Sequence, residues 1–401
     1  MLAQEGARLA VVVLDPSDAA VPSAKVTLIQ RSRGSARSAE TEVTGNCYFG
    51  SLNPGAYRLE VEKQGFDKYV IEDLELHARD FQTLRLNIKV AAAEKTEVTV
   101  KGTVEGVQID TSTGTTVSGR YSIDLPSNAR SIQSLVLMAP GIIYAGGNLV
   151  GGGDVNANGL RSNTNYYTVD GLSANAGAAP STGGGLLGGF GTGGTTSSTM
   201  PATAAGNSYN LISLEAMQEF RVQTSTFAPE FGRSPGAQVS VTSRSGSNFF
   251  HGSAYGMYRN DRFNANDWFA NSNGLSRGEL RMEDYGGTVG GPIEQNKTFF
   301  FASFEDLHLT QPRTALDTVP DLASRKFAGP ALQPYLNAFP IPNGQDLGNG
   351  AAQFLSVYST PSSTAATSVR VDHVISDRTS GFLRYSYTPS DNTSRGGFDS
   401  S

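Results

Sequence analysis

The C-terminal part of the chain contains strand-length segments in which apolar and polar side chains alternate, and this pattern narrows the possible folds most. In the segment SVRVDHVISD, Val369, Val371 and Ile375 share one face, whereas Arg370 and Asp372 share the other. A period of two is the side-chain period of a β-strand. Barrel strands that cross a membrane and strands of a half-buried soluble sheet both alternate in this way. The pattern therefore predicts a sheet and leaves its surroundings open.

Three further segments alternate in the same way, namely EDYGGTVGGPI (283–293), KTFFFASFEDLHL (297–309) and GFLRYSYTP (381–389). Each is close in length to the about 9–11 residues that a membrane-crossing strand needs. Aromatic side chains near the strand ends fit the girdles at the two interfaces of a membrane barrel. These aromatic residues are Phe249, Tyr255, Tyr258, Trp268, Phe269 and Tyr285. Between the strands we expect a long loop at 311–365.

The composition is typical of a β-rich extracytoplasmic protein. Only 17% of the 401 residues are charged and 46 are glycine, against about a quarter charged and roughly 7% glycine in average proteins. The net charge of −6 argues against a nucleic-acid partner, because nucleic-acid-binding proteins present a basic face. The single cysteine, Cys47, excludes an intrachain disulfide and a thiolate metal cluster.

Residues 6–90 are expected to form an immunoglobulin-like β-sandwich. Short alternating runs follow one another at the spacing of about 8–12 residues that such sandwiches show, with turn signals between them. The runs are ARLAVVVLD, KVTLIQ, CYFGSL, AYRLEVEK, KYVIEDLEL and TLRLNIKV. We expect Tyr48, Phe49, Tyr57 and Phe66 to anchor the packing. We also expect Gly55 to supply a positive φ angle.

The same region resembles the carboxypeptidase regulatory-like domain. The matching segments are VLDPSDAAVPSAKVTL (13–28), the T-G-x-C-Y-F turn (44–49) and LNPGAYRLEVEKQGF (52–66). A zinc carboxypeptidase would also need a His and a Glu three residues apart, and a second His, to hold its metal. None of the four histidines is followed by Glu at the third position. We therefore predict that the protein is not an enzyme and has no catalytic residues, no metal and no cofactor.

Residues 91–110 are expected to be a linker with one β-prone segment, Thr96–Lys101. In the block 111–246 that follows, SIQSLVLM (131–138) predicts a short amphipathic helix that stops at Pro140-Gly141. The Gly-rich stretch 180–199 predicts a flexible loop, and no Gly-Lys-Ser/Thr follows it as a nucleotide-binding loop would require.

Near the end of this block the spacing of the apolar residues changes from a helix-like to a strand-like period. Leu211, Leu214 and Met217 recur at helix-like intervals, and Val239 and Val241 then alternate with polar residues as in a strand. A Gly/Ser turn at 245–247 leads directly into aromatic-rich strands. We interpret this segment as the junction between a mixed domain and a sheet of different composition.

The block 111–246 resembles the plug domain of TonB-dependent outer-membrane receptors. The segments that carry the resemblance are IDLPSNARSIQSLVLMAPGI (123–142), NANGLRSNTNYYTVDGLSAN (156–175) and LEAMQEFRVQTSTFAPEFGRSPGAQVSVTSRSGSN (214–248). With a regulatory-like sandwich before it, the arrangement is similar to Oar-like receptors. The segments 251–269 and 286–307 also resemble the early barrel strands of those receptors. The resemblance implies a mainly β protein with a sandwich, a mixed α/β plug and, over 248–401, the first strands of a truncated antiparallel transmembrane β-barrel.

The resemblance also implies a function and partners. Such a receptor lies in the cell outer membrane with its sandwich in the periplasm, and it imports a solute that is a carbohydrate, a siderophore or peptide-like. Its partners are a TonB-type energy-transducing protein, the solute and outer-membrane lipid. The candidate residues for the TonB contact are Thr96, Glu97, Val98, Thr99 and Val100, because a β-prone segment in a linker suits strand addition.

Six residues of the plug-like motifs are expected to have structural roles. Asp170 and Gly171 are expected to form a tight turn, in which Asp bonds the backbone two residues on. The other four are charged residues that a plug would direct against a polar barrel wall, and they are Glu219, Arg221, Glu230 and Arg233. None of the carboxylates pairs with a His in a way that suggests acid–base catalysis.

The length limits this interpretation. A plugged barrel of 22 strands needs several hundred residues, and the part after residue 246 suffices for five or six strands. No apolar run of about 20 residues and no secretory signal are present. We therefore expect an N-terminal fragment or a truncated gene product. The alternative is a secreted or surface-attached β-rich binding or adhesion protein without transport activity.

Overall fold

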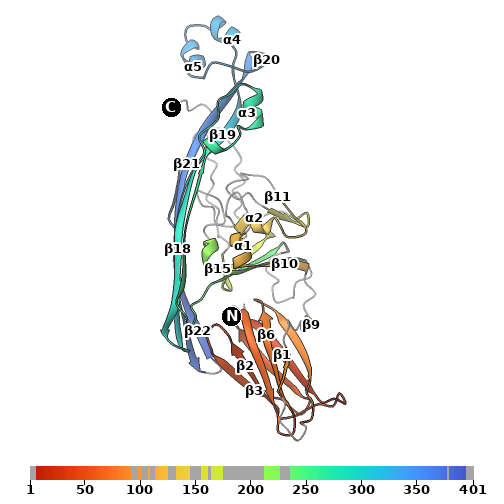
Figure 1. Cartoon of the computed structure of the whole chain (residues 1–401). Helices are drawn as coiled ribbons and strands as arrows, with labels where there is room; N and C mark the ends of the chain where they lie inside the picture. The colour runs from red at the N-terminus through yellow and green to blue at the C-terminus, as the bar shows by residue number, and fades with distance from the viewer. Residues whose placement is uncertain are drawn as a thin grey trace.

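The computed structural model describes residues 6–91, 97–100, 107–108, 113–124, 132–144, 155–160, 164–174, 212–225, 235–376 and 379–393. Within these residues the protein is mainly β with a few short helices, as predicted. Figure 1 shows an N-terminal sandwich, a central part and a long sheet that flanks the central part and reaches the sandwich at one end. We use the names N-terminal sandwich for the described residues up to 108, central part for those in 113–243 and long sheet for 251–393. None of the described helices is long and apolar enough to span a membrane.

The N-terminal sandwich consists of two sheets that share one apolar core. The first has the order β4 (Asn46–Leu52), β1 (Ala7–Leu14), β7 (Phe81–Asn87) and β9 (Val107–Gln108). The second has the order β3 (Ala36–Glu40), β2 (Lys25–Gln30), β5 (Gly55–Glu62), β6 (Lys68–Leu76) and β8 (Glu97–Val100). Alternate residues of β1 are buried and pack against alternate residues of β5 and β6. These strands therefore lie where the period-two pattern predicted them.

Three of the four expected anchors pack in this core, and one does not. Phe49 and Tyr57 are buried and Phe66 is partly buried against the core. Tyr48 was predicted to be an anchor, but 56% of its surface is exposed. It lies between buried Cys47 and Phe49 in a strand that alternates, so its side chain must point outward. Gly55 has the predicted positive φ, at 138°.

The central part is a mixed sheet covered by short helices. The sheet order is β10 (Thr113–Ser118), β15 (Met217–Ser225), β16 (Gln238–Ser243), β13 (Tyr166–Val169) and β14 (Leu172–Ser173). Helices α1 (Gly119–Asp124) and α2 (Ile132–Val136) and the pair β11 (Ile142–Tyr144) and β12 (Val155–Ala157) complete it. Buried residues of α2, β15 and β16 form one apolar cluster, so the predicted helix at 131–138 is present in shortened form.

The helix-like spacing of Leu211, Leu214 and Met217 was misleading. Leu211 lies outside the described residues, and from Ile212 onward the structure has only a single 3-10 turn, Leu214–Ala216, before Met217 begins β15. The Ser213 side chain accepts a hydrogen bond from the Ala216 amide and so satisfies this short turn. The pattern beyond it has period two, and the pairing of β15 with both β10 and β16 decides the conformation.

The long sheet is an antiparallel meander of β17 (His251–Asn260), β18 (Arg281–Glu294), β19 (Thr298–Pro320), β21 (Ala351–Ser376) and β22 (Thr379–Tyr387). Two short strands, β20 (Asp346–Gly348) and β23 (Ser390–Asn392), pair with β21. Helix α3 (Trp268–Ser272) lies in the β17–β18 connection, and α4 (Leu322–Phe327) and α5 (Gln333–Asn337) lie between β19 and β21.

The loop expected at 311–365 is much shorter than predicted. Residues 311–320 of β19 pair without interruption with residues 351–360 of β21, so only 321–350 connects the two strands. Because antiparallel pairing satisfies the backbone groups of both strands, the ladder continues far beyond the apolar segments that identify it in the sequence. At the sandwich end, by contrast, three residues separate β18 from β19 and two residues separate β21 from β22.

Candidate functional site

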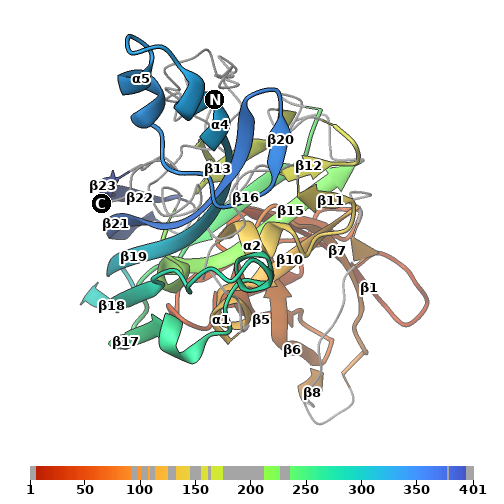
Figure 2. The ribbon, with the colours of Figure 1, turned by 90° about the horizontal axis from the view of Figure 1, so that it is seen from above.

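The burial pattern of the long sheet is inverted relative to a soluble sheet. Figures 1 and 2 show that one face of the sheet, which we call the inner face, lies toward the central part. On this face polar side chains are buried, among them Asp284, Thr288, Ser303, Glu305, Arg370 and Asp372. On the opposite outer face large apolar side chains are exposed, among them Tyr285, Val289, Ile293, Phe304, Val369 and Ile375. Such an arrangement is favourable when the outer face meets hydrocarbon, as in outer-membrane barrels.

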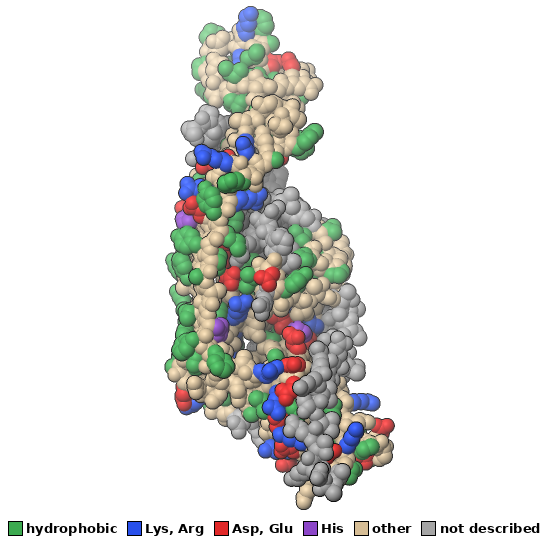
Figure 3. Space-filling view, viewed as in Figure 1, with side chains coloured by type: hydrophobic (Ala, Val, Ile, Leu, Met, Phe, Trp, Pro, Cys, Tyr) green, Lys and Arg blue, Asp and Glu red, His purple; other side chains and the backbone are tan. Residues whose placement is uncertain are grey.

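The exposed apolar side chains form a band of limited height. On β18 it runs from Tyr285 to Ile293, which matches the about 9–11 residues of a membrane-crossing strand. Charged residues flank it, with Arg281 and Glu283 before the band and Glu294 after it. Figure 3 shows these hydrophobic side chains along the outer side of the sheet, with charged side chains above and below them.

Five of the six aromatic residues expected in the interfacial girdles are exposed, and these are Phe249, Tyr258, Trp268, Phe269 and Tyr285. Tyr255 is different. It pairs with Gly286 on the inner face, and its hydroxyl donates to Glu305 Oε2 at 2.8 Å. Its ring therefore belongs to the polar interior and not to a girdle, because β17 places it one residue out of phase with the outer face.

Asp170 and Gly171 form a two-residue turn between β13 and β14. Both residues have a positive φ, 48° for Asp170 and 79° for Gly171, which is the type I′ geometry that Asp-Gly favours. The Asp170 carboxylate accepts hydrogen bonds from a residue that is distant in the sequence. Its Oδ1 accepts from the Ser243 amide at 2.8 Å, and its Oδ2 accepts from the Ser243 hydroxyl at 2.7 Å. The expected bond to the backbone two residues on is replaced by these contacts across the sheet.

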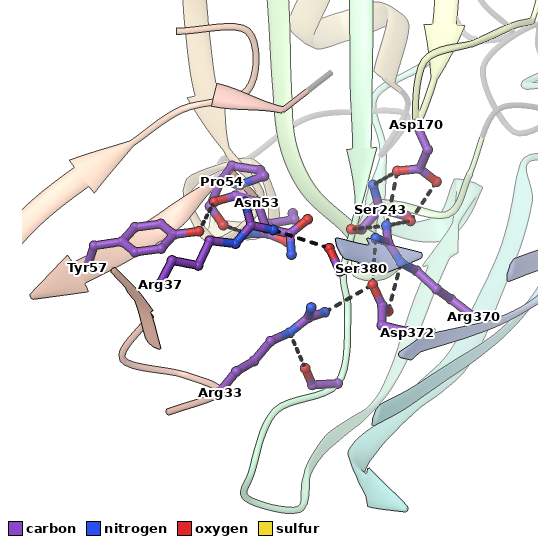
Figure 4. A network of polar contacts seen from close by, with 12 residues as sticks. Arg33, Arg37, Asn53, Pro54, Tyr57, Asp170, Ser243, Arg370, Asp372 and Ser380 are labelled. Atoms are coloured by element: carbon purple, nitrogen blue, oxygen red, sulfur yellow. Dashed lines mark hydrogen bonds and ion pairs between the residues drawn. The ribbon is translucent and has the colours of Figure 1, made fainter. Parts of the chain in front are cut away.

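Arg370 of β21 joins Asp170 to the long sheet (Figure 4). Its guanidinium forms a fork with Asp372, with Nε at 3.0 Å and Nη2 at 2.9 Å from the two carboxylate oxygens. Its Nη1 lies 3.2 Å from Asp170 Oδ1, and its plane lies over the Phe382 ring at 4.2 Å. Arg384 Nε approaches Asp170 Oδ2 at 3.2 Å from β22. Buried charges of alternating sign thus tie the central part to the sheet.

Arg33 extends this network into the N-terminal sandwich. It belongs to the turn between β2 and β3, and only 3% of its side chain is exposed. Its Nη2 lies 3.1 Å from Asp372 Oδ1, and its guanidinium lies 5.0 Å from the centre of the Phe299 ring. A cavity of about 430 Å³ borders the network and is lined by residues of all three parts, including Pro54, Gln218 and Phe382.

Glu219 and Arg221 were expected to face a barrel wall, but they contact the sandwich. They lie two residues apart on β15 and therefore point to the same side, away from Phe220 and Val222 in the central core. Glu219 accepts from the Ala78 amide at 3.2 Å. Arg221 Nη1 donates to the Ala78 carbonyl and to Asp80 Oδ1, both at 2.9 Å. The sandwich turn at 77–80 takes the place that was assigned to the barrel.

The remaining candidate residues fall into two groups. Glu230, Arg233 and Thr96 lie outside the described residues. Residues Glu97–Val100 form β8, which pairs in parallel with β6 at the end of one sandwich sheet. Among the described residues, no group of three or more His, Cys, Asp or Glu is placed to hold a metal ion.

Sequence reasoning missed Arg33 as a site residue and did not single out Arg370 or Asp372. The signal for the latter two was present, because they alternate with outward valines and must share the inner face. Arg33 carried no comparable signal. It lies in a turn, and its partner comes from the far end of the chain.

His77 makes the contact between sandwich and central part sensitive to pH. The Glu219 carboxylate, 3.5 Å from His77 Nδ1, raises the pKa of His77 above its ordinary 6.5, against the opposing effect of burial. Asp80 and Glu75 add negative charge in the same direction. A raised pKa means that the stabilisation is complete below about pH 6.5 and is lost as the pH rises through the raised value. We expect the melting temperature in detergent to fall over that interval.

The variant His77→Gln isolates this contribution, because it keeps the size of the side chain and removes the titration. The difference in melting temperature between the two proteins should be largest below about pH 6.5 and should shrink as the pH rises. A difference that stays constant from pH 5 to pH 9 would contradict the assignment.

Comparison with known proteins agrees with the geometry. The model of the carboxypeptidase regulatory-like domain matches residues 8–91, and that of an outer membrane beta barrel domain matches residues 242–329. The TonB-dependent transporter Oar of Myxococcus xanthus is 29% identical over 282 residues, which are 66% of this chain. The chain is homologous to this transporter. It spans 23% of the relative's length.

The match to an outer membrane beta barrel domain and the match to Oar indicate that the protein belongs to the outer membrane. The relative itself is a TonB-dependent transporter. Solved structures with a similar course of the chain include the outer membrane transporter YddB from Escherichia coli, with a TM-score of 0.47 and 13% identity over 71% of this chain and 34% of that one. The siderophore receptor PirA from Acinetobacter baumannii gives a TM-score of 0.43 and 13% identity over 71% and 32%.

Proposed function

We propose that the chain is part of a TonB-dependent outer-membrane receptor that imports a solute. The observation that carries the proposal is the inverted burial of the long sheet, because its outer face suits lipid and its inner face holds polar residues against the central part. In this proposal residues 111–246 are the plug and 248–401 are the first strands of the barrel. Homology to Oar supports the assignment.

The lengths of the connections in the long sheet indicate how the receptor is oriented in the outer membrane. Outer-membrane barrels have short periplasmic turns and longer extracellular loops. The short connections after β18 and β21 lie at the end where the sandwich docks, whereas α3, α4 and α5 lie in the long connections at the other end. We therefore place the N-terminal sandwich in the periplasm and the helical connections outside the cell.

The linker 91–110 is the proposed contact for a TonB-type protein. Its strand β8 is the last strand in the order β3-β2-β5-β6-β8, so its second edge is open within the described sheet. Strand addition to such an edge uses backbone hydrogen bonds and demands little of the side chains. The solute belongs to one of the classes named above, a carbohydrate, a siderophore or a peptide-like molecule, and binds from the side of the long connections.

Membrane fractionation tests the proposal. When the chain is exported in a Gram-negative host, we expect it in the outer-membrane fraction, resistant to high salt and alkali and extracted by detergent. Its outward apolar band requires this, because soluble monomers rarely expose large contiguous apolar surfaces to water. A monomeric protein in the soluble periplasmic fraction would instead support the adhesion alternative. The N-terminal sandwich alone, residues 1–108, serves as the soluble control.

A further inference from the structure

We propose that the N-terminal sandwich acts as a brace, by which we mean a rigid body that contacts both the plug and the long sheet. Its contact with the long sheet, the sheet end of the brace, breaks before the plug moves. The proposal rests on the function proposed above, because it assigns a regulatory step to the same receptor. Two turns of the sandwich carry it. The turn at 31–35, between β2 and β3, contacts the sheet, and the turn at 77–80, between β6 and β7, contacts the plug.

The sheet end of the brace consists of polar contacts. Arg33 is buried against Asp372 at 3.1 Å and lies over the Phe299 ring. The Ser32 carbonyl accepts from the Asn248 amide at 3.1 Å, and the Asn248 side chain accepts from the Asn296 amide at 2.8 Å. The turn is thus held at once by β21, by the segment that joins plug and sheet, and by the turn between β18 and β19.

The plug end has different partners. The Ala78 amide donates to Glu219 and the Ala78 carbonyl accepts from Arg221, so both backbone groups of one residue are held by β15. Asp80 adds an ion pair with Arg221 at 2.9 Å, and Arg79 donates to Thr168 Oγ1 of β13 at 3.0 Å. This end therefore contacts two strands of the plug sheet, β15 and β13.

A sandwich with one core transmits motion from one turn to the other. Both turns project from the same packed body, whose apolar cluster is separate from that of the plug. Packed cores are stiff and do not deform gradually. A displacement of the plug relative to the sheet must therefore break one of the two ends.

The sheet end is the weaker one. Its buried ion pair is accompanied by hydrogen bonds from Asn248 and borders a cavity of about 430 Å³. An ion pair contributes much less once water reaches it. The plug end combines an ion pair with several hydrogen bonds to backbone. Strand β8 of the linker pairs with β6 of the sandwich, so tension on the linker acts on the brace itself. The sandwich then leaves the sheet together with the plug.

Spin-label distances in the full chain in detergent test the brace. Labels are attached to cysteines at Val43 in the sandwich, Lys297 in the sheet turn and Tyr121 in the plug, all of which are exposed, with buried Cys47 replaced by alanine. In the parent protein the pairs 43–297 and 43–121 should both give narrow distance distributions. Arg33→Gln should broaden the pair 43–297 and leave 43–121 narrow, and Arg221→Gln should do the reverse.

Arg31→Gln is the matched control, because Arg31 lies in the same turn but is exposed and pairs with Asp73 of the sandwich. It should change neither distribution. The brace is refuted when Arg33→Gln leaves the pair 43–297 narrow, when it broadens both pairs together, or when the parent is already broad. A membrane-embedded protein with any of these results refutes only the brace. A protein absent from the membrane fraction refutes the proposed function whatever the distances.

Discussion

Replacing Arg370 with glutamine is expected to lower the free energy of unfolding by about 3–5 kcal/mol, the usual cost of breaking a buried ion pair from one side. Arg370 contacts Asp170 and Asp372, and all three side chains are almost fully buried. Glutamine keeps some hydrogen bonding but leaves two carboxylates with less positive charge nearby. Urea unfolding of the detergent-solubilised protein measures the effect.

A second substitution separates charge from packing at this site. Adding Asp372→Asn to Arg370→Gln removes one of the stranded charges, so the double variant should be more stable than the sum of the two single effects predicts. The control is Arg281→Gln, whose side chain is 54% exposed and pairs with Glu283 on the same sheet. An exposed pair contributes about 0.2–1 kcal/mol. An Arg370 variant that loses no more than this control would show that the buried network does not hold the plug.

Replacing Val289 with arginine is expected to destabilise the protein in phospholipid bilayers by about 2–4 kcal/mol, the cost of a basic side chain near the middle of the membrane on the lipid face of a barrel. Val289 lies on the outer face of β18, halfway between Tyr285 and Ile293, and 48% of its surface is exposed. The folded fraction after urea titration in lipid vesicles measures the change.

Leu316→Arg is the matched control for Val289→Arg. Leu316 is also an exposed apolar residue, 61% accessible, but it lies on β19 far beyond the band. Surface substitutions of this kind usually change stability by about 0.5 kcal/mol or less. A water-soluble adhesion protein would tolerate both substitutions equally, whereas a membrane barrel tolerates only the second. Equal effects of the two variants would therefore rule out the proposed membrane band.

Local patterns predicted much of the fold correctly. Alternation in the sequence predicted which face of β18, β19 and β21 carries Val289, Phe304 and Val369, because successive side chains of a strand must point to opposite sides. Asp170-Gly171 predicted a tight turn, because few residue pairs adopt two positive φ angles in succession. The sandwich strands followed from short alternating runs between turn residues. These features depend on neighbours in the chain and are readable from it.

Where local signals were ambiguous, pairing decided the structure. The segment 311–320 shows little apolar alternation, yet it forms strand because its partner, 351–360, satisfies its backbone. Met217 has helical spacing toward Leu214, yet it begins β15 between two neighbouring strands. In both cases hydrogen bonds to a distant segment outweighed the local preference.

The sequence by itself determined the β-rich class, the faces of the strands and the turn at Asp170. Only the tertiary structure decided which charges meet. It joined Arg33 of the sandwich to Asp372 of the sheet, and it turned Glu219 and Arg221 toward the sandwich and Asp170 toward Arg370. The physical reason is that a buried charge is costly until an opposite charge or a hydrogen-bond donor or acceptor satisfies it. The residues that do so here come from distant parts of the chain, and folding alone brings them together.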